Sequence, residues 1–412
     1  MDYKLIKKIF FDLFKVDKID YGKTKVLTVA HDNDRGFFYH GKYYSQLIDS
    51  VEDDLKQRGI ECISIARIIS TVKGDIAYGN VFSPEGSFAR ALVMKRIKGF
   101  IFKKGYPYST MEEKIWGKIL DRTGAEKVIA ILPSRELCNA CHKRKIWVAD
   151  MQHGVIAENH PWYGKKYRSS DPPHYLPNAF LVWDEGSAQV LNSYCKEKNI
   201  DVIPIGNRWV ARFIQPVYSD KMVKELIESN NLPSSNKKNI LISLSWGCEG
   251  IENGIIPESL ISIIEKTSEK YSWLLRLHPN QLKGFATHES KKFFTIFEKR
   301  LKKYAIWDIP TKMPLPTLLQ NIDIHISWNS SVAIEAAQMG IKSALIDPRL
   351  RRKLSGDYYN FYHKNGMIDF IEDDETVIRE WINKHITSSK QRENYDSFNN
   401  TYLQLLDFIS NG

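Results

Sequence analysis

The sequence predicts an α/β protein built from two Rossmann-like domains that face each other across a cleft. The chain has 412 residues, a length that suits two domains of about 200 residues better than one large core. Short apolar runs rich in β-branched residues alternate with helical stretches, the pattern that builds parallel sheets with crossover helices. The alternation occurs twice along the chain, so we expect two consecutive sheets of this kind.

The first predicted domain covers residues 1–206. Its predicted strands are short and nearly continuous in apolar residues, as strands covered on both faces are. They lie at residues 25–30, 61–65, 98–102, 127–131, 145–149, 179–182 and 201–205. Helices are predicted at residues 44–58 and 111–123, because each stretch ends at a glycine, Gly59 or Gly124, the residue most common after a helix.

The second predicted domain covers residues 239–412. It follows residues 207–238, which the sequence predicts to be a crossing segment, a helix and a polar linker. Its predicted strands lie at residues 239–244, 272–277, 305–308, 323–327 and 343–346. Its predicted helices lie at residues 257–270, 289–304, 316–321 and 331–339.

Composition and cysteine usage predict a soluble, cytoplasmic protein. Apolar residues make up 43% of the chain, and no window reaches the roughly 18 apolar residues that a membrane span needs. The five cysteines form an odd, scattered set, as expected in a reducing compartment. The run from Cys138 to His142 matches the pattern for covalent haem attachment, but no second cysteine pair completes a zinc site and haem attachment requires export. We therefore expect no cofactor.

The formal net charge of +10 favours a polyanionic partner. The basic residues are scattered and no zinc finger, RRM or helix-turn-helix pattern occurs, so we expect no nucleic acid. The first 14 residues lack the cleavage site of a secretory signal. As a helix, they could rest on an anionic membrane surface, or simply pack on their own domain. The residues concerned are Lys4, Lys7, Lys8, Phe10, Phe11, Leu13 and Phe14.

Two points in the second half predict a nucleotide site beyond the carboxyl ends of strands, where doubly wound sheets bind ligands. One strand ends at Arg276 and is followed by His278 and Pro279, so the imidazole and the guanidinium could both donate to a phosphate. Another strand leads into Ser330 and Ser331, whose hydroxyls could hold a phosphate at the start of a helix. A histidine that only caps a loop, and a serine that only caps a helix, are the alternatives.

Two further residues belong to this predicted site. Glu335, about one turn into the helix, could accept hydrogen bonds from ribose hydroxyls, or it could be a capping or solvated carboxylate. Ser245 lies in a run of small residues after the first strand of this half, which would allow a ligand to approach closely.

The first half offers a candidate base after the strand at residues 145–149. Gly154 would permit a sharp turn that exposes His153, whose ordinary pKa of about 6.5 suits proton removal from a hydroxyl near neutral pH. Asp150 or Glu158 could orient or replace this histidine, and Gln152 could contact the acceptor. A purely structural histidine is the alternative.

The loop after the first strand is a candidate acceptor site. Asp32 and Asp34 satisfy the Asp-x-Asp pattern of metal-binding glycosyltransferases, but a pattern this short occurs often by chance. We therefore expect no metal and interpret Asp34 as a second candidate for the catalytic base. Arg35 and the pair Lys165-Lys166 could recognise an acidic acceptor. Tyr39, Tyr43 and Tyr44 could stack on sugars, or form a packed loop.

These motifs resemble the GT-B glycosyltransferases of bacterial capsule and lipopolysaccharide synthesis. The His278-Pro279 strand end and the Ser330-Ser331 turn look most like those of relatives that use CMP-activated acidic sugars or CDP-glycerol. The resemblance to bacterial sialyltransferases and polysialyltransferases implies donor contacts for His278, Ser330 and Ser331, and ribose binding for Glu335. Those enzymes also carry an acidic motif, which Asp184-Glu185-Gly186 matches in residue type but not in its expected position.

The function predicted from these motifs is transfer of a sugar, possibly CMP-activated, from a nucleotide donor to a surface polysaccharide or lipid-linked acceptor. A base in the first half would deprotonate the acceptor hydroxyl, which attacks the anomeric carbon as the nucleotide phosphate leaves. Three alternatives stay open: a CDP-glycerol-type polyol-phosphate transferase, a nucleotide-sugar 2-epimerase, and a non-catalytic glycan-binding subunit.

Overall fold

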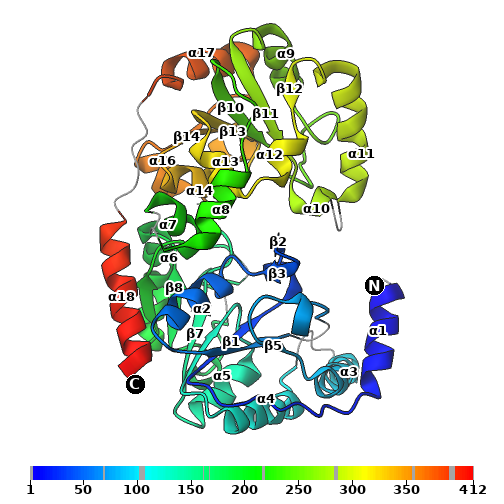
Figure 1. The fold of residues 1–412 in the computed structure, drawn as a ribbon, viewed down its shortest axis with the longest axis vertical. Coiled ribbons are helices and arrows are strands. Elements are labelled where there is room, and N and C mark those ends of the chain that lie inside the picture. Colours follow the sequence, from blue (N-terminus) through cyan, green and yellow to red (C-terminus); the bar gives the residue numbers. More distant parts are fainter. Residues whose placement is uncertain are drawn as a thin grey trace. The chain divides into compact units, whose positions relative to one another are not determined.

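The chain divides into two compact units (Figure 1). Unit 1 comprises Met1–Trp209 and Asp396–Gly412, and unit 2 comprises Val210–Tyr395. The computed structural model describes residues 3–67, 70–101, 107–160, 162–166, 168–215, 219–282, 286–354, 358–388 and 395–411, with side chains from residue 7 onward.

The described part of unit 1 contains a seven-stranded sheet in which every pairing is parallel. Its spatial order is β5 (Val81–Phe82), β4 (Cys62–Ala66), β1 (Val26–Ala30), β6 (Lys127–Ala130), β7 (Trp147–Met151), β8 (Ala179–Val182) and β9 (Asp201–Pro204). The residues of β1 and β4 are all buried, because helices cover both faces of a sheet of this kind.

Along the chain, the helices of unit 1 lie before, between and after its strands. They are α1 (Tyr3–Leu13), α2 (Ile48–Gln57), α3 (Glu85–Ile101), α4 (Thr110–Thr123), α5 (Arg135–His142), α6 (Glu185–Cys195) and α18 (Asp396–Asn411). The boundary between the units lies within α7 (Arg208–Ile214). A short antiparallel hairpin, β2 (Phe37–Tyr39) and β3 (Lys42–Tyr44), follows β1.

The described part of unit 2 contains a six-stranded parallel sheet. Its order is β12 (Ala305–Ile306), β11 (Tyr271–Arg276), β10 (Lys238–Ser243), β13 (Ile324–Ser327), β14 (Lys342–Leu345) and β15 (Ile368–Phe370). Its helices are α8 (Lys221–Ser229), α9 (Glu258–Thr267), α10 (Pro279–Leu282), α11 (Thr287–Ile296), α12 (Asp308–Lys312), α13 (Leu315–Gln320), α14 (Val332–Gln338), α15 (Pro348–Arg351), α16 (Asn360–Lys364) and α17 (Glu375–His385).

The strand order reverses once in each sheet. In unit 1 the chain starts at β1, adds strands on one side, and then returns to the other side of β1 with β6. Unit 2 repeats this order, with β10 as the first strand and β13 on its other side. Ligands of such sheets bind beyond the carboxyl ends of the strands at this reversal point. The predicted fold class, α/β with two Rossmann-like domains, is confirmed.

The predicted strand at residues 98–102 is wrong. Residues up to Ile101 form the last turns of α3, whose first backbone amides, from Gly86 and Ser87, donate to the carboxylate of Asp17 at 3.0 and 2.7 Å. This cap comes from a residue about 70 positions earlier, so the local sequence does not reveal the start of the helix.

Two predicted boundaries also differ from the structure. The helix predicted from residue 44 begins at Ile48, because Tyr44 pairs with Phe37 in the hairpin. The C-terminal residues 396–412, predicted as part of the second domain, belong to unit 1 instead. There Tyr402, Leu405, Leu406 and Ile409 of α18 lie in one apolar cluster with strands β1, β6 and β7.

Candidate active site

His278 lies just beyond the carboxyl end of β11 and has a fixed orientation. Its backbone amide donates to Oε1 of Gln281 at 2.8 Å, and its Nδ1 accepts from the backbone amide of Asn280 at 3.1 Å. Because Nδ1 acts as an acceptor, a neutral imidazole carries its proton on Nε2. Burial lowers the pKa of His278, and Arg276 lowers it further, so the ring is neutral near pH 7. No described residue is hydrogen-bonded to Nε2, which leaves one donor for a ligand.

Gln281 and Glu289, which were not predicted from the sequence, connect His278 to the loop after β10. The fully buried Gln281 donates from Nε2 to the carbonyl of Ser245 at 3.1 Å and to Glu289 at 3.0 Å. Glu289 in turn accepts from the backbone amide of Gly247 at 2.8 Å. Gln281 stands three positions after His278, a spacing that could have drawn attention to it. The hydroxyl of Ser245 is buried, and among the described residues it has only a weak interaction with the Cys248 thiol.

Arg276 and Glu335 lie close enough for their charges to interact. The guanidinium of Arg276 donates from Nη1 to the carbonyls of Pro310 and Met313, the latter at 2.8 Å, and burial lowers its pKa to about 10. Burial raises the pKa of Glu335 to about 7, against the opposing effect of Arg276. The Glu335 carboxyl has no hydrogen bond to any described residue, so it can donate to or accept from a hydroxylated ligand.

The two serines of the predicted phosphate turn differ. Ser330 is buried, and its hydroxyl accepts from the backbone amide of Val332 at 3.3 Å, which is the capping role considered as the alternative. Ser331 is exposed at the start of α14 and makes no side-chain cap. Pro279 is exposed at the start of α10, where it ends the strand-to-helix turn after His278. In unit 2, therefore, His278, Ser245 and Glu335 have the polar groups best placed for a ligand.

His153 of unit 1 follows β7 and contacts a tyrosine that the sequence reading did not identify. Its Nδ1 lies 2.6 Å from Oη of Tyr163, and its backbone amide also donates to that oxygen, at 3.3 Å. A histidine base needs the tautomer in which Nδ1–H donates to Tyr163, because Nε2 then keeps a lone pair. Burial lowers the pKa of His153, while the charge of Asp34 opposes this shift. The structure thus brings His153 and Asp34, two predicted catalytic residues, close together.

Asp34 and Asp32 have local structural partners. The Asp34 carboxylate accepts from the backbone amide of His31 at 3.0 Å. Asp32 accepts from the backbone amide of Thr71 at 2.6 Å and from that of Val72 at 3.1 Å, so it anchors the loop after β4.

Asp150 is buried in the sheet and does not contact His153 through a hydrogen bond. Its Oδ1 accepts from the backbone amide of Leu132 at 2.9 Å, whereas no described residue is bonded to Oδ2. Burial raises its pKa to about 7. Leu132 has a left-handed backbone (φ 50°), and Arg67 donates to its carbonyl. Asp150 therefore stabilises a strained turn after β6, while Glu158 is exposed on the loop after β7.

Two residues predicted to contact the acceptor, Arg35 and Tyr44, are buried instead. Arg35 forms an ion pair with Asp49 at 2.7 Å and has no exposed side-chain surface. Tyr44 is fully buried, and its hydroxyl donates to Asp53 at 2.8 Å. Both prefer the interior because α2 and β4 supply their polar partners, so the predicted acceptor contacts of Arg35 and Tyr44 are wrong.

The predicted acceptor contact of Gln152 is wrong for the same reason. Its side-chain oxygen accepts from the backbone amide of Trp183 at 2.7 Å, and its nitrogen donates to the carbonyl of Gly154 at 2.9 Å. Asp184, the first residue of the acidic motif, caps α6 by accepting from the amide of Ser187 at 2.7 Å. Tyr43 is partly exposed beside Phe38 and stays a candidate.

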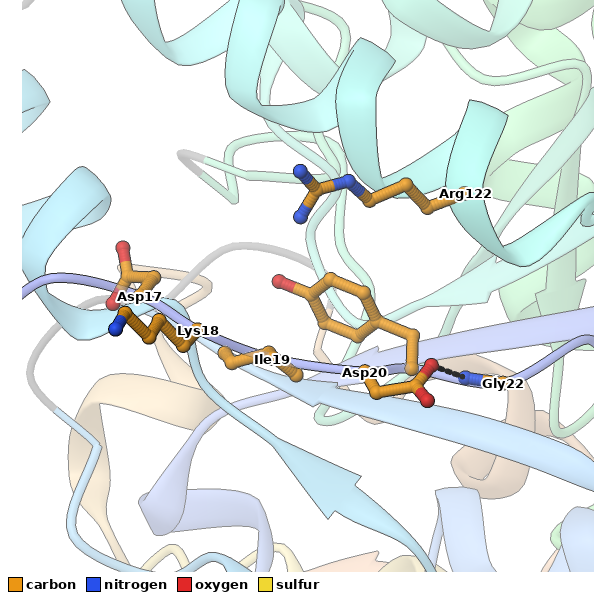
Figure 2. Close-up of a pocket in the computed structure, with 7 residues that line it drawn as sticks. Asp17, Lys18, Ile19, Asp20, Gly22 and Arg122 are labelled. Atoms are coloured by element: carbon orange, nitrogen blue, oxygen red, sulfur yellow. Dashed lines mark hydrogen bonds between the residues drawn. The ribbon is translucent and has the colours of Figure 1, made fainter.

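A surface cavity of about 610 Å³ lies elsewhere in unit 1 (Figure 2). It is lined by residues 17–22, which precede β1, and by Arg122 near the end of α4. Segments that precede parallel strands meet at the amino edge of the sheet, so this cavity is separate from His153 and Asp34.

Among the described residues, no group of three or more His, Cys, Asp or Glu side chains is arranged to hold a metal ion. A search of the same residues found no helix long and apolar enough to cross a membrane.

Comparisons with known proteins show the fold. No protein-family model and no curated protein matches the sequence. Among solved structures, the wall teichoic acid polymerase TagF matches with a TM-score of 0.58 and 14% identity, over 99% of this chain and 93% of that one. UDP-GlcNAc 2-epimerase from Methanocaldococcus jannaschii matches with a TM-score of 0.57 and 12% identity, over 94% and 99% of the two chains.

A third structure, UDP-GlcNAc 2-epimerase from Neisseria meningitidis bound to UDP-GlcNAc, matches with a TM-score of 0.53 and 14% identity, over 94% of this chain and all of that one. At these identities the likeness extends to architecture alone. The chain therefore has the GT-B fold, with two Rossmann-like domains.

Proposed function

We propose that this chain is a glycosyltransferase that moves a sugar from a nucleotide donor to a surface glycan or a lipid-linked acceptor. The observation that carries the proposal is the polar site beyond the carboxyl ends of β10 and β11, beside the reversal point of unit 2. There His278 has an Nε2–H without a partner among the described residues, and the buried hydroxyl of Ser245 has only a weak partner, the Cys248 thiol. Two donors of this kind suit a phosphate oxygen.

The other residues take roles that follow from their surroundings. Glu335, whose carboxyl is unbonded within the described chain, would bind the ribose hydroxyls, and Ser331 would contact the phosphates. In unit 1, His153 would act as the base that removes the acceptor proton, with Tyr163 fixing its tautomer. The similar structures support a nucleotide donor, since they include a UDP-GlcNAc 2-epimerase bound to UDP-GlcNAc and a TagF variant soaked with CDPG.

An activity assay separates this proposal from its alternatives. The full chain is incubated with UDP-GlcNAc, CDP-glycerol or a CMP-activated acidic sugar, with and without a panel of glycan acceptors. A new glycosidic bond that forms only with acceptor supports the proposal. A product that retains phosphorus indicates a polyol-phosphate transferase, and a new epimer formed without acceptor indicates an epimerase. Nucleotide binding without any turnover would favour a glycan-binding subunit.

We also propose that unit 1 rests on the inner face of the plasma membrane through α1 and α3, which pack against each other. Phe10 and Phe11 of α1, and Phe14 just after its end, are 58, 59 and 73% exposed, and Phe100 and Ile101 of α3 are 88 and 63% exposed. Cations accompany them: Lys7 lies near the Phe11 ring at 5.9 Å, and Arg96 and Lys98 belong to α3. Apolar side chains next to cations suit an anionic lipid surface.

Sedimentation with lipid vesicles tests the membrane contact. The protein should sediment with vesicles of phosphatidylcholine and phosphatidylglycerol, and less with phosphatidylcholine alone. A Phe14→Ser, Phe100→Ser variant should lose most of this binding. Phe38→Ser is a matched control, because Phe38 is 60% exposed on the hairpin instead. Equal sedimentation of the double variant and the control would refute the contact.

A further inference from the structure

A second cavity of about 570 Å³ lies in unit 1, away from the candidate active site. The tip of the β2–β3 hairpin, the second half of α2 and the residues just before β4 and β5 line it. Glu61 and Asn80 immediately precede those two strands, whereas His153 follows the carboxyl end of β7. The two sites are therefore at different places on the sheet.

The cavity contains a buried carboxyl group with one unbonded oxygen. Glu52 on α2 is only 8% exposed and is one of the lining residues. Its Oε1 accepts from the hydroxyl of Thr28, but no described residue donates to its Oε2. Gly79 lies beside this oxygen, since a Cβ there would stand 3.1 Å from Oε2. The glycine thus leaves the space next to the carboxyl open.

A hydrogen-bonded chain in the core orients this carboxyl. Thr28 Oγ1 lies 2.7 Å from Ser64 Oγ, and Ser64 accepts from Arg35 at 2.6 Å. Arg35 is itself fixed by its ion pair with Asp49. An unpaired buried carboxyl costs free energy, and here burial raises its pKa to about 7. A buried polar atom without a partner in the protein calls for water, an ion or a ligand to complete its hydrogen bonds, and shifted pKa values cluster at functional sites.

The rim combines aromatic rings with polar groups of both signs. The rings of Tyr39 and His40 stack with centroids 4.2 Å apart, and Tyr78 lines the same cavity while its hydroxyl donates to Asp53 at 3.0 Å. Lys42 and Lys56 are exposed at the rim. Acidic and basic groups both line the cavity, so it does not select for one strong charge. Aromatic faces beside hydrogen-bonding groups match a sugar ring, which has an apolar face and hydroxyls at its edge.

We propose that this cavity binds a single sugar residue, with its ring against the stacked Tyr39–His40 pair and a hydroxyl donating to Oε2 of Glu52. It would hold a unit of the glycan acceptor remote from the reacting end. In that respect the inference rests on the proposed function, but binding of the sugar itself needs no nucleotide.

Saturation-transfer NMR on the full chain tests the inference directly. The probes are glucose, galactose, N-acetylglucosamine and N-acetylmannosamine, and the disaccharides of each, at millimolar concentration. At least one should receive magnetisation from the wild type. The signal should fall roughly fivefold or more in Tyr39→Ala and in Glu52→Gln, which loses the charged acceptor but keeps the shape. Thermal unfolding first establishes that each variant is folded.

Controls separate this inference from the proposed function. Glu126→Gln removes an exposed carboxylate elsewhere in unit 1, and Tyr304→Ala removes a partly exposed tyrosine of unit 2, so both should keep the wild-type signal. His278→Ala should also keep it, even where nucleotide binding is lost. The inference fails if no probe receives magnetisation, or if a folded Tyr39→Ala or Glu52→Gln protein gives the wild-type signal.

Discussion

At the scale of single residues, two histidines share one arrangement. His278 and His153 both follow a parallel strand, both have Nδ1 in a hydrogen bond, and burial lowers the pKa of both. In each ring Nε2 is the atom available to a ligand. Their different partners suit different roles, because a backbone amide makes His278 a donor, whereas a hydroxyl lets His153 act as a base.

The pH dependence of turnover reports on His153. The base is active when neutral, and its lowered pKa keeps it neutral to more acidic pH than an ordinary histidine. The acid limb of kcat/KM should therefore lie below about pH 6.5. His153→Gln should lower kcat by about 100-fold or more, and Tyr163→Phe by less, with nucleotide affinity unchanged in both. Rate measurements between pH 5 and 8 check this. An acid limb above pH 7 would exclude His153 as the base.

The sequence could place candidate residues beyond the strand ends but not their hydrogen-bond partners. His278, Ser245 and His153 were found because each directly follows a recognisable strand. Arg35, Tyr44 and Gln152 were misassigned, since each also follows a strand or joins a loop, and only the fold shows that their polar groups are used internally. Burial of a polar side chain depends on neighbours that are distant in sequence.

At the scale of elements, the buried strands and the helices with local caps were predictable. The helix α4 begins after Ser109, whose hydroxyl accepts from the amide of Glu112, and ends at Gly124 in the left-handed region (φ 67°). The serine cap and the glycine stop both lie next to the helix in sequence, so the local sequence reveals them. The strand predicted at residues 98–102 failed because a run of only three apolar residues at 100–102 has no periodicity that separates a strand from the end of a helix.

The turn between α5 and β7 offers a test of backbone strain. Lys145 there is exposed and has φ of 57°, a conformation that costs a residue with a Cβ about 1–2 kcal/mol. Lys145→Gly should raise the free energy of unfolding by up to about 1 kcal/mol, after the entropy cost of glycine. Lys118→Gly, an exposed position inside α4, should instead lower it by about 1 kcal/mol. Denaturant titration gives both values, and destabilisation by Lys145→Gly would contradict the assigned turn.

At the scale of the whole molecule, unit 1 is made of two separate stretches of the chain, and unit 2 is the stretch between them. Residues 210–395 form unit 2, and the chain then returns to unit 1 with α18. The alternation of strands and helices was enough to predict two sheets. It could not assign α18, because an amphipathic helix shows which of its faces is buried but not which sheet covers that face.

Substitutions in α18 should therefore act on unit 1. Leu406 is 3% exposed and lies in the apolar cluster with β1 and β6, so Leu406→Ala should cost about 2–5 kcal/mol of stability. Leu403→Ala, at a position that is 47% exposed on the same helix, should change stability little. Nucleotide affinity, which we propose to reside in unit 2, should be unchanged in both variants. A large fall in affinity for Leu406→Ala would place α18 with the nucleotide site instead.

Nucleotide binding tests the central claim most directly. Thermal unfolding is measured with CMP, CDP, UDP, GDP or dTDP, each with and without magnesium, for the wild type, His278→Ala and the control His288→Ala, an exposed histidine of α11. A nucleotide whose dissociation constant is about 1% of its concentration adds about 2.7 kcal/mol to stability. We predict that at least one nucleotide stabilises the wild type and His288→Ala, and that His278→Ala loses most of this effect. No stabilisation by any nucleotide, or equal stabilisation of all three proteins, would contradict the account.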